Sequence, residues 1–209
     1  KDKGRDLVVR GAVSGPFSLA CALAGTEAVL VATVEDPLFV RALLEHAART
    51  TVVFGRAFLA AGVEPVLFDS KASPAASSPR VFREFVLPVY REAVIPALRE
   101  AGAKTLPLII GGDTTPVLEG LLRTGAGQLL CDAGSDLDLF LKRCREEKRP
   151  LRASVDARLV HRGRPEEVGD RLLLPEEPRD LGQELEVLDG AEAGEAKARM
   201  TRMLEGPES

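Results

Sequence analysis

The chain has 209 residues, of which 45% are hydrophobic and 29% charged, and its formal net charge is -4. This length and apolar content suit one globular domain of ordinary size or two small ones, and they argue against wholesale disorder. A slightly acidic chain with no Trp and only 4% aromatic residues has neither the positive charge nor the stacking surface typical of a nucleic-acid-binding protein.

The sequence shows no targeting signal, and its cysteine pattern is that of reduced thiols. We therefore expect a cytoplasmic location and no membrane partner. No apolar run reaches the ~20 residues that a membrane-spanning helix needs. The charged start, residues 1–6, is not followed by a signal-peptide core. The three cysteines, Cys21, Cys131 and Cys144, are odd in number and far apart, which is typical of reduced thiols and not of a disulfide framework.

Short apolar runs predict five β-strands. Each run is rich in Val, Ile or Leu and too short for a helix, and continuous apolar character is typical of parallel strands that are covered on both faces. The predicted strands are residues 6–12, 63–68, 106–111, 128–132 and 152–156.

Between these strands the sequence predicts helices over residues 36–61, 79–101 and 135–148. Asp36, Ser78 and Thr115 each place a side-chain oxygen directly before a proline, and this pattern favours a helix start. Pro88 and Pro96 lie inside the second helix, so we expect it to be kinked or split.

The alternation of strands and helices with right-handed crossovers fits two architectures, a (β/α) barrel and an open doubly wound sheet. No glycine-rich phosphate loop follows the first strand. Residues 1–168 carry this pattern, whereas residues 169–209 are rich in Glu, Gly and Arg. In this charged C-terminal extension, residues 172–174 suit a short strand and residues 191–204 a surface helix.

Polar residues at the carboxyl ends of the predicted strands are candidate site residues, because parallel strands present these ends at one edge. Asp69 is suited to accept hydrogen bonds from a ligand or to act as a base, and Thr114 to bind a ligand oxygen. Asp is also a common turn and cap residue. Two interpretations of these carboxylates therefore remain, a functional ring at the site and a set of helix caps and turns. No zinc-type ligand spacing occurs, so we expect no metal site. The candidates are Ser14, Phe17, Asp69, Ser70, Asp113, Thr114, Asp132 and Asp156.

Five motifs occur in the order seen in the uroporphyrinogen decarboxylase family, which the chain resembles. This family includes the decarboxylase of haem synthesis and corrinoid-dependent methyltransferases. The resemblance implies an α/β fold of the (β/α)8 TIM-barrel type. Since only five or six βα units are visible, we expect an incomplete barrel over residues 1–168, completed by another chain segment or in a homo-oligomer. The motifs are GPFSLACALAG (15–25), FDSKASP (68–74), SSPRVFREFVLPVYREAVIPAL (77–98), IIGGDTTPVLEGLLRTGAG (109–127) and ASVDARLVHRGRPEEV (153–168).

Within the family, the segments TTPVLE and ASPAASSPRVFREFVLP are more similar to the methyltransferases. The resemblance therefore implies methyl transfer with a corrinoid (cobalamin) on a partner protein. The zinc-binding His-x-Cys of the thiol methyltransferases is replaced by Leu108 and Ile110, so zinc is not expected.

Two alternatives stay open. In the decarboxylase, a substrate-binding tyrosine stands where this chain has Ala22, while Ser70 matches the serine that contacts a substrate carboxylate. The other alternative is a non-catalytic ligand-binding member. In the methyltransferase or decarboxylase interpretation, the resemblance gives catalytic roles to Asp69, Asp113 and Asp156. It gives tetrapyrrole or small-molecule binding to Ser14, Phe17, Ser70, Thr114 and Asp132.

Overall fold

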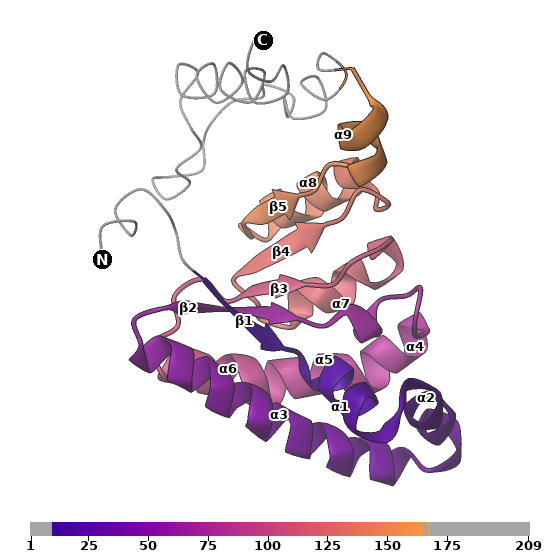
Figure 1. Ribbon diagram of the computed structural model, residues 1–209, viewed down its shortest axis with the longest axis vertical. Helices are drawn as coiled ribbons and strands as arrows, with labels where there is room; N and C mark the ends of the chain where they lie inside the picture. Colours follow the sequence, from indigo (N-terminus) through magenta and orange to yellow (C-terminus); the bar gives the residue numbers. More distant parts are fainter. Residues whose placement is uncertain (1–9, 165–166, 168–209) are drawn as a thin grey trace, which may run out of the picture. The chain divides into compact units, whose positions relative to one another are not determined.

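The computed structural model describes residues 10–164 and residue 167 (Figure 1). The chain divides into two compact units, Lys1–Ser154 and Val155–Ser209. The short strand and surface helix predicted at 172–174 and 191–204 lie outside the described residues, as do residues 6–9 of the first predicted strand.

The first unit contains one parallel sheet, in which the strands follow the order β1-β2-β3-β4-β5 (Figure 1). This arrangement confirms the α/β class and the parallel sheet. The strand order never reverses, as in a barrel and unlike a doubly wound sheet. The strands are β1 (Arg10–Ser14), β2 (Glu64–Phe68), β3 (Pro107–Ile109), β4 (Gln128–Cys131) and β5 (Leu151–Ala153).

Four of the five strand ends differ from the prediction, and of these β3 stops two residues early at Ile109 and β4 one residue early at Cys131. The first strand continues two residues beyond its predicted end, because Ser14 is still in register with Phe68. The fifth strand stops at Ala153, three residues early, and Asp156 instead accepts a hydrogen bond from Arg158 N at the start of α9. Ser14 is therefore a strand residue, and Asp156 is a helix cap of the second unit.

Helices connect the strands and start largely where the sequence predicts. The Asp36 side chain accepts from Phe39 N at 3.0 Å and Ser78 from Val81 N at 3.3 Å, which confirms both predicted caps. The Thr115 cap was wrong, because its hydroxyl accepts from Asp136 N instead. The helical elements are α1 (Pro16–Ala24), α2 (Thr26–Glu35), α3 (Pro37–Ala60), η2 (Ser70–Ala72), α4 (Pro79–Val81), η3 (Phe82–Val86), α5 (Leu87–Val89), η4 (Tyr90–Val94), α6 (Ile95–Glu100), η5 (Thr115–Val117), α7 (Leu118–Arg123), α8 (Leu137–Glu146) and α9 (Ala157–Arg162).

The stretch from α4 to α6 is interrupted twice by π-helical turns, η3 and η4, as the two internal prolines predict. Pro88 has no N–H to give to the carbonyl of Glu84, four residues earlier. Arg41 of α3 donates to this carbonyl at 3.2 Å, and its guanidinium lies 5.0 Å from the centre of the Phe85 ring. The irregular helix is thus tied to α3 at the position where proline removes a donor.

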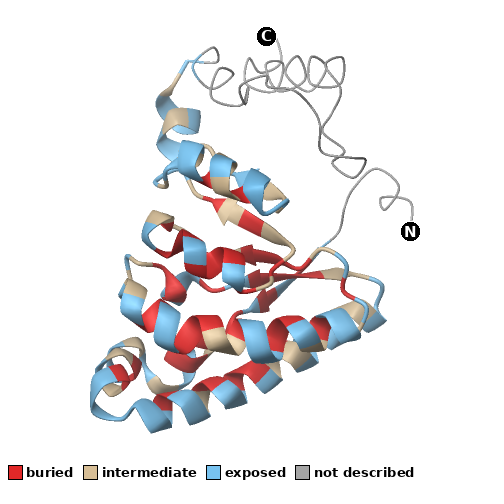
Figure 2. Ribbon diagram, turned by 180° about the vertical axis from the view of Figure 1, so that it is seen from behind, coloured by how far each residue is buried: buried red, intermediate tan, exposed pale blue. Residues whose placement is uncertain are grey.

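The two faces of the sheet differ in burial, and the helices lie along one of them (Figures 1 and 2). α3 packs against β1 and β2, and α8 packs against β5. Along β1 the residues alternate, with Gly11 and Val13 buried and Ala12 and Ser14 exposed. The core therefore lies between the sheet and the helices, and the opposite face, which would be the inside of a barrel, is open along β1.

None of the helices in the described part of the chain is by itself long and apolar enough to cross a membrane. Together, α1 and α2 meet the length and composition requirement, but they are bent by 103° at their junction.

Candidate functional site

The carboxyl ends of the strands bring together exposed side chains on the open face. Ser14, Phe68 and Ile109 are in register across β1, β2 and β3, so their side chains point to the same side of the sheet. Ser14 is exposed, and Phe68 is 42% exposed although it lies between Ser14 and Ile109 in this row. An exposed aromatic ring next to a hydroxyl gives this edge a surface that suits a flat, partly apolar ligand.

Asp69, directly after β2, is fully buried and accepts hydrogen bonds from three donors. Its Oδ2 accepts from Phe17 N at 3.2 Å and from the Tyr90 hydroxyl at 2.8 Å, and its Oδ1 accepts from Ser18 N at 2.6 Å. The two backbone donors belong to the first turn of α1, where a carboxylate also interacts favourably with the helix dipole. Asp69 thus caps α1 from a neighbouring strand.

This cluster explains why a glycine precedes the helix. A Cβ atom at Gly15 would lie 2.3 Å from the Tyr90 hydroxyl and 2.4 Å from Asp69 Cγ, so a larger residue would push the carboxylate away. Burial raises the pKa of Asp69, and its hydrogen bonds with Ser18 and Tyr90 act in the opposite direction. Burial likewise raises the pKa of Tyr90 well above its ordinary value.

Three of the sequence motifs therefore meet in one buried cluster: GPFS at the start of α1, FDS at the end of β2, and the tyrosine in η4. Neither oxygen of Asp69 faces solvent, and the Phe17 side chain is 1% exposed and belongs to the core. Asp69 and Phe17 therefore stabilise the structure at the strand ends. A ligand can contact only the exposed residues beside them.

A second polar cluster joins the ends of β3, β4 and β5 around Asp132. The carboxylate accepts from Gly112 N at 2.7 Å, from Ala133 N at 3.0 Å and from the Ser154 hydroxyl. The Ser154 hydroxyl is the largest of the influences that lower the pKa of Asp132, followed by the amide of Gly112. Asp132 is half-buried and, because three donors hold it, remains ionised at neutral pH.

The loop after β3 is pinned to the loop after β4 by Ser135. Its Oγ accepts from Thr114 N at 3.0 Å, lies 3.2 Å from Thr114 Oγ1, and is 3.2 Å from the carbonyl oxygen of Gly112, to which it donates. Thr114 is fully buried, so its hydroxyl serves this network. Its neighbour Asp113 is exposed and accepts from Thr115 N at 3.0 Å through Oδ1.

The eight predicted site residues thus fall into distinct groups. Ser14, Ser70 and Asp113 are exposed at the strand ends, and Asp132 is partly exposed there. Three others, Asp69, Phe17 and Thr114, are buried beneath this edge. Asp156 belongs to the second unit, where it caps α9 and lies 3.6 Å from the Arg158 guanidinium.

Sequence reasoning did not single out Phe68, Tyr90, Ser135 or Ser154. The predicted fifth strand was too long and included Ser154. Because the strand ends at Ala153, Ser154 directly follows it and would have been selected as a strand-end residue. Phe68 was counted as part of an apolar strand, although its register with Ser14 makes it face the open side. No local signal marks Tyr90 or Ser135, since both act on residues far along the chain.

In the part of the chain that the structure describes, no three His, Cys, Asp or Glu side chains lie close enough together to hold a metal ion. Leu108 and Ile110 are 1% and 2% exposed, and Leu108 is in register with the buried Leu67. The intervening positions, Ile109 and Gly111, alternate toward the open face, and neither is a metal ligand. The residues at this edge therefore do not fit a protein-bound zinc.

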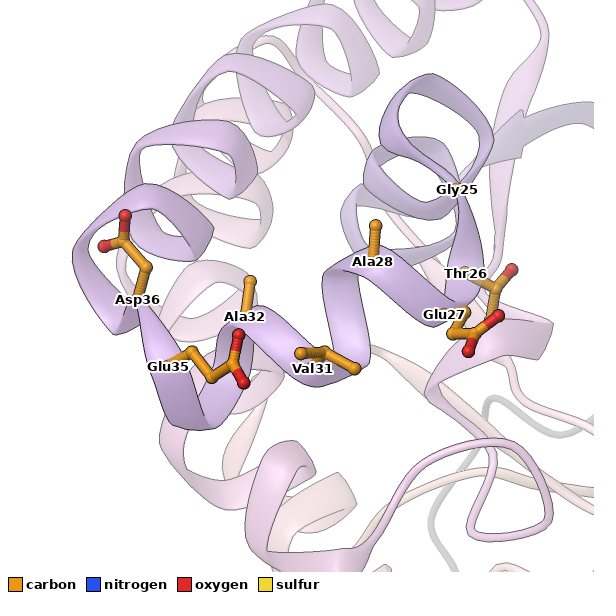
Figure 3. Close-up of a pocket in the computed structure, with 8 residues that line it drawn as sticks. All are labelled: Gly25, Thr26, Glu27, Ala28, Val31, Ala32, Glu35 and Asp36. Carbon is orange, nitrogen blue, oxygen red and sulfur yellow. The ribbon is translucent and has the colours of Figure 1, made fainter.

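A hollow of about 650 Å³ lies beside α2 (Figure 3). Glu27, Val31 and Glu35 of α2 line it together with Asp36. It contains none of the predicted site residues.

The fold and the edge described above define a βα protein of the barrel type with a site at the carboxyl ends of its strands. The sequence profile of the family described as uroporphyrinogen decarboxylase (URO-D) matches residues 1–173, and the chain belongs to this family. This family assignment confirms both the resemblance and the barrel-type fold, of which five βα units are seen in the described residues.

Two known proteins show how far the similarity extends. A uroporphyrinogen decarboxylase of Saccharopolyspora erythraea is 41% identical over 113 residues, which are 53% of this chain and 31% of that protein. A methyltransferase from Methanosarcina mazei superimposes with a TM-score of 0.67 at 18% identity, covering 79% of this chain and 48% of the other. The latter likeness is one of fold. The chain spans about a third to a half of the length of these proteins.

Proposed function

We propose that the protein is a methyltransferase-like enzyme of this family that acts with a corrinoid carried by a partner protein and uses no protein-bound zinc. The observation that carries the proposal is the chemistry of the strand ends. The exposed groups there are hydroxyls, carboxylates and one aromatic ring, and the described residues add two exposed cations, Lys71 directly after Ser70 and Arg152 of β5, which is in register with Leu130. A porphyrinogen has many carboxylates, and such an edge would leave most of them unpaired.

A corrinoid supplies a cobalt centre that gives up or accepts a methyl group. The protein's own residues would bind and orient the small molecule at the other end of the transfer. The Phe68 ring offers an apolar contact, and the hydroxyls of Ser14 and Ser70 can donate hydrogen bonds. Asp113 is the exposed carboxylate at this edge and would take the proton that an O–H or N–H methyl acceptor releases as its bond to carbon forms.

Asp132 and Asp69 have different parts in this proposal. Asp132 keeps its charge and holds the loops after β3 and β4 in place through Gly112 N and Ser154. Asp69 fixes the first turn of α1 next to Ser14 and Ser70. Both are positioning residues, and Asp113 is the proposed catalytic residue.

The test is methyl transfer between methylcobalamin and alcohol, amine and thiol acceptors, followed by the visible absorbance of the corrinoid. We expect Asp113→Asn to lower the rate about 10²–10⁴-fold, as for loss of a general base. Asp138→Asn removes an exposed carboxylate from the first turn of α8 and should leave the rate unchanged. A protein that neither binds nor demethylates methylcobalamin would contradict the proposal.

The decarboxylase is the second candidate, because the relative that is 41% identical over 113 residues bears that name and Ser70 matches the family's serine. Against it stands Ala22, which is exposed and has no hydroxyl for a substrate. Conversion of uroporphyrinogen to coproporphyrinogen by the full chain would establish this alternative and exclude the first proposal.

A further inference from the structure

The outward side of α2 is largely apolar although it faces solvent. Val29 and Thr33 pack into the core from the opposite side of this helix. Val31 is 46% exposed and Val34 is 71% exposed, and the helical repeat places both on the outward side. A helix side that stays in water normally carries polar residues, so this one has the character of a contact surface. The α2 face is defined as the exposed residues of the helix: Glu27, Ala28, Val31, Val34 and Glu35.

The charged groups of this surface are carboxylates, and they lie at both ends of the helix. Figure 3 shows Glu27 at one end of the hollow and Glu35 with Asp36 at the other, with Val31 and alanine side chains between them. At 1.5 Å per residue, Glu27 and Glu35 are about 12 Å apart along the helix axis. Among the described residues that line the hollow, none is basic. The surface therefore combines an apolar middle with negative charge at both ends.

Glu35 is placed unfavourably within the chain itself. It is the last residue of α2, where the helix dipole is negative, and the carboxylate of Asp36 follows directly. The last turn of α2 contains no basic residue. Within the part of the chain that the structure describes, neither Glu27 nor Glu35 belongs to an ion pair. A cation from outside would relieve the repulsion at this end, so the charges favour a basic partner.

A second copy of this chain does not fit the α2 face. Antiparallel packing of two such faces would place Glu27 of each copy against Glu35 of the other, and parallel packing would place each glutamate against its own counterpart. Like charges would meet in both arrangements. The same carboxylates would be repelled by the phosphates of a nucleic acid or of an anionic membrane.

We propose that the α2 face binds an amphipathic helix of a different protein, one with an apolar stripe between two basic residues seven or eight positions apart. Such a spacing spans about 10–12 Å, so the two cations would pair with Glu27 and Glu35 while the stripe covers Val31 and Val34. The inference does not depend on the proposed function, because α2 carries none of the residues proposed for methyl transfer.

Binding of two synthetic peptides to the full chain, followed by fluorescence anisotropy, tests the chemistry of the partner. One labelled helical peptide carries Leu at positions i, i+3, i+4 and i+7 between two Lys residues eight positions apart, and Gln and Ala elsewhere. The matched peptide has Glu in place of both Lys residues. We expect the Lys peptide to bind at least about tenfold more tightly. Equal binding of the two peptides, or binding of neither, would overturn the proposal.

Substitutions on the α2 face test the location, and each concerns an exposed residue, so the core is left intact. Val31→Asp should weaken binding of the Lys peptide at least about tenfold, as for loss of a central contact. Glu27→Lys combined with Glu35→Lys should reverse the preference in favour of the Glu peptide. Unchanged binding by Val31→Asp would overturn the proposal.

A matched control separates this site from a general effect of net charge. Glu100→Lys combined with Asp138→Lys makes the same change in net charge at exposed positions on α6 and α8, and should keep the preference for the Lys peptide. A reversed preference in this control would show that net charge alone attracts the peptide, and would overturn the proposal.

Two measurements without peptide test the other possible occupants. Sedimentation of the full chain would reveal self-association, and flotation with phosphatidylcholine vesicles would reveal a membrane contact. Neither should depend on Val31. Self-association or vesicle binding that Val31→Asp abolishes would assign the α2 face to a second copy or to lipid, and would overturn the proposal.

Discussion

Asp69 shows how a residue that sequence patterns nominate for chemistry can instead organise the site. It was selected because it follows a strand, and the structure gives it three donors and no exposure. The hydroxyl of Tyr90 is the one donor that can be removed without changing the backbone. The cluster is therefore open to a direct stability test.

Tyr90→Phe should lower the free energy of unfolding by about 1–3 kcal/mol, because it leaves a buried carboxylate oxygen with one donor fewer. Thr50→Val, which removes a hydroxyl on α3 that reaches His46 O at 3.3 Å, is the control and should cost far less. Denaturant unfolding of both variants gives the comparison. Equal stability of Tyr90→Phe and the parent would show that the bond contributes nothing.

Asp132 predicts a dependence of stability on pH. Its pKa is lowered in the folded protein, so its contribution is present above its ordinary pKa of about 4 and is lost as the pH falls through the folded value. Ser154→Ala removes the largest cause of the lowering. This variant should therefore lose less stability than the parent between about pH 5 and pH 3. Parallel slopes for the two proteins in acid unfolding would contradict the assignment.

At the scale of elements, the irregular helix from α4 to α6 is bonded to α3 at the position where Pro88 lacks a backbone N–H. Arg41 donates to the carbonyl that Pro88 cannot serve. Arg41→Ala should destabilise the protein by about 1 kcal/mol, the net worth of one hydrogen bond, and less so in a Pro88→Ala background where an N–H is restored. A double-mutant cycle measures this coupling. Strictly additive effects would show that the two residues act independently.

Local pattern was sufficient for the elements that are defined by their own residues. The apolar runs predicted the five strands seen in the described residues, and Asp36-Pro37 and Ser78-Pro79 predicted helix starts with their caps. The ends of the strands were not predictable in this way, since Ser14 stays in the sheet only through its register with Phe68. A strand end is fixed by the neighbouring strand, and this error hid Ser154.

The candidate site was predictable to a similar degree. The rule that parallel strands share an edge found Ser14, Ser70, Asp113 and Asp132. It could not separate the exposed Asp113 from the buried Asp69, because burial depends on α1 and η4, which approach from elsewhere in the chain.

At the scale of the whole molecule, five parallel strands of a barrel-type fold present one open face and one face covered by helices (Figure 2). Everything proposed for ligand binding is at the carboxyl ends of these strands, while α3, which packs against β1 and β2, lies on the helical side.

The most direct test of the central claim is hydrogen–deuterium exchange of the full chain with and without methylcobalamin. If the corrinoid binds at the strand ends, we expect slower exchange in peptides that cover residues 68–71, 111–116 and 131–136, and unchanged exchange along α3 and α8. Protection confined to the hollow beside α2, or no protection at the strand ends, would contradict it.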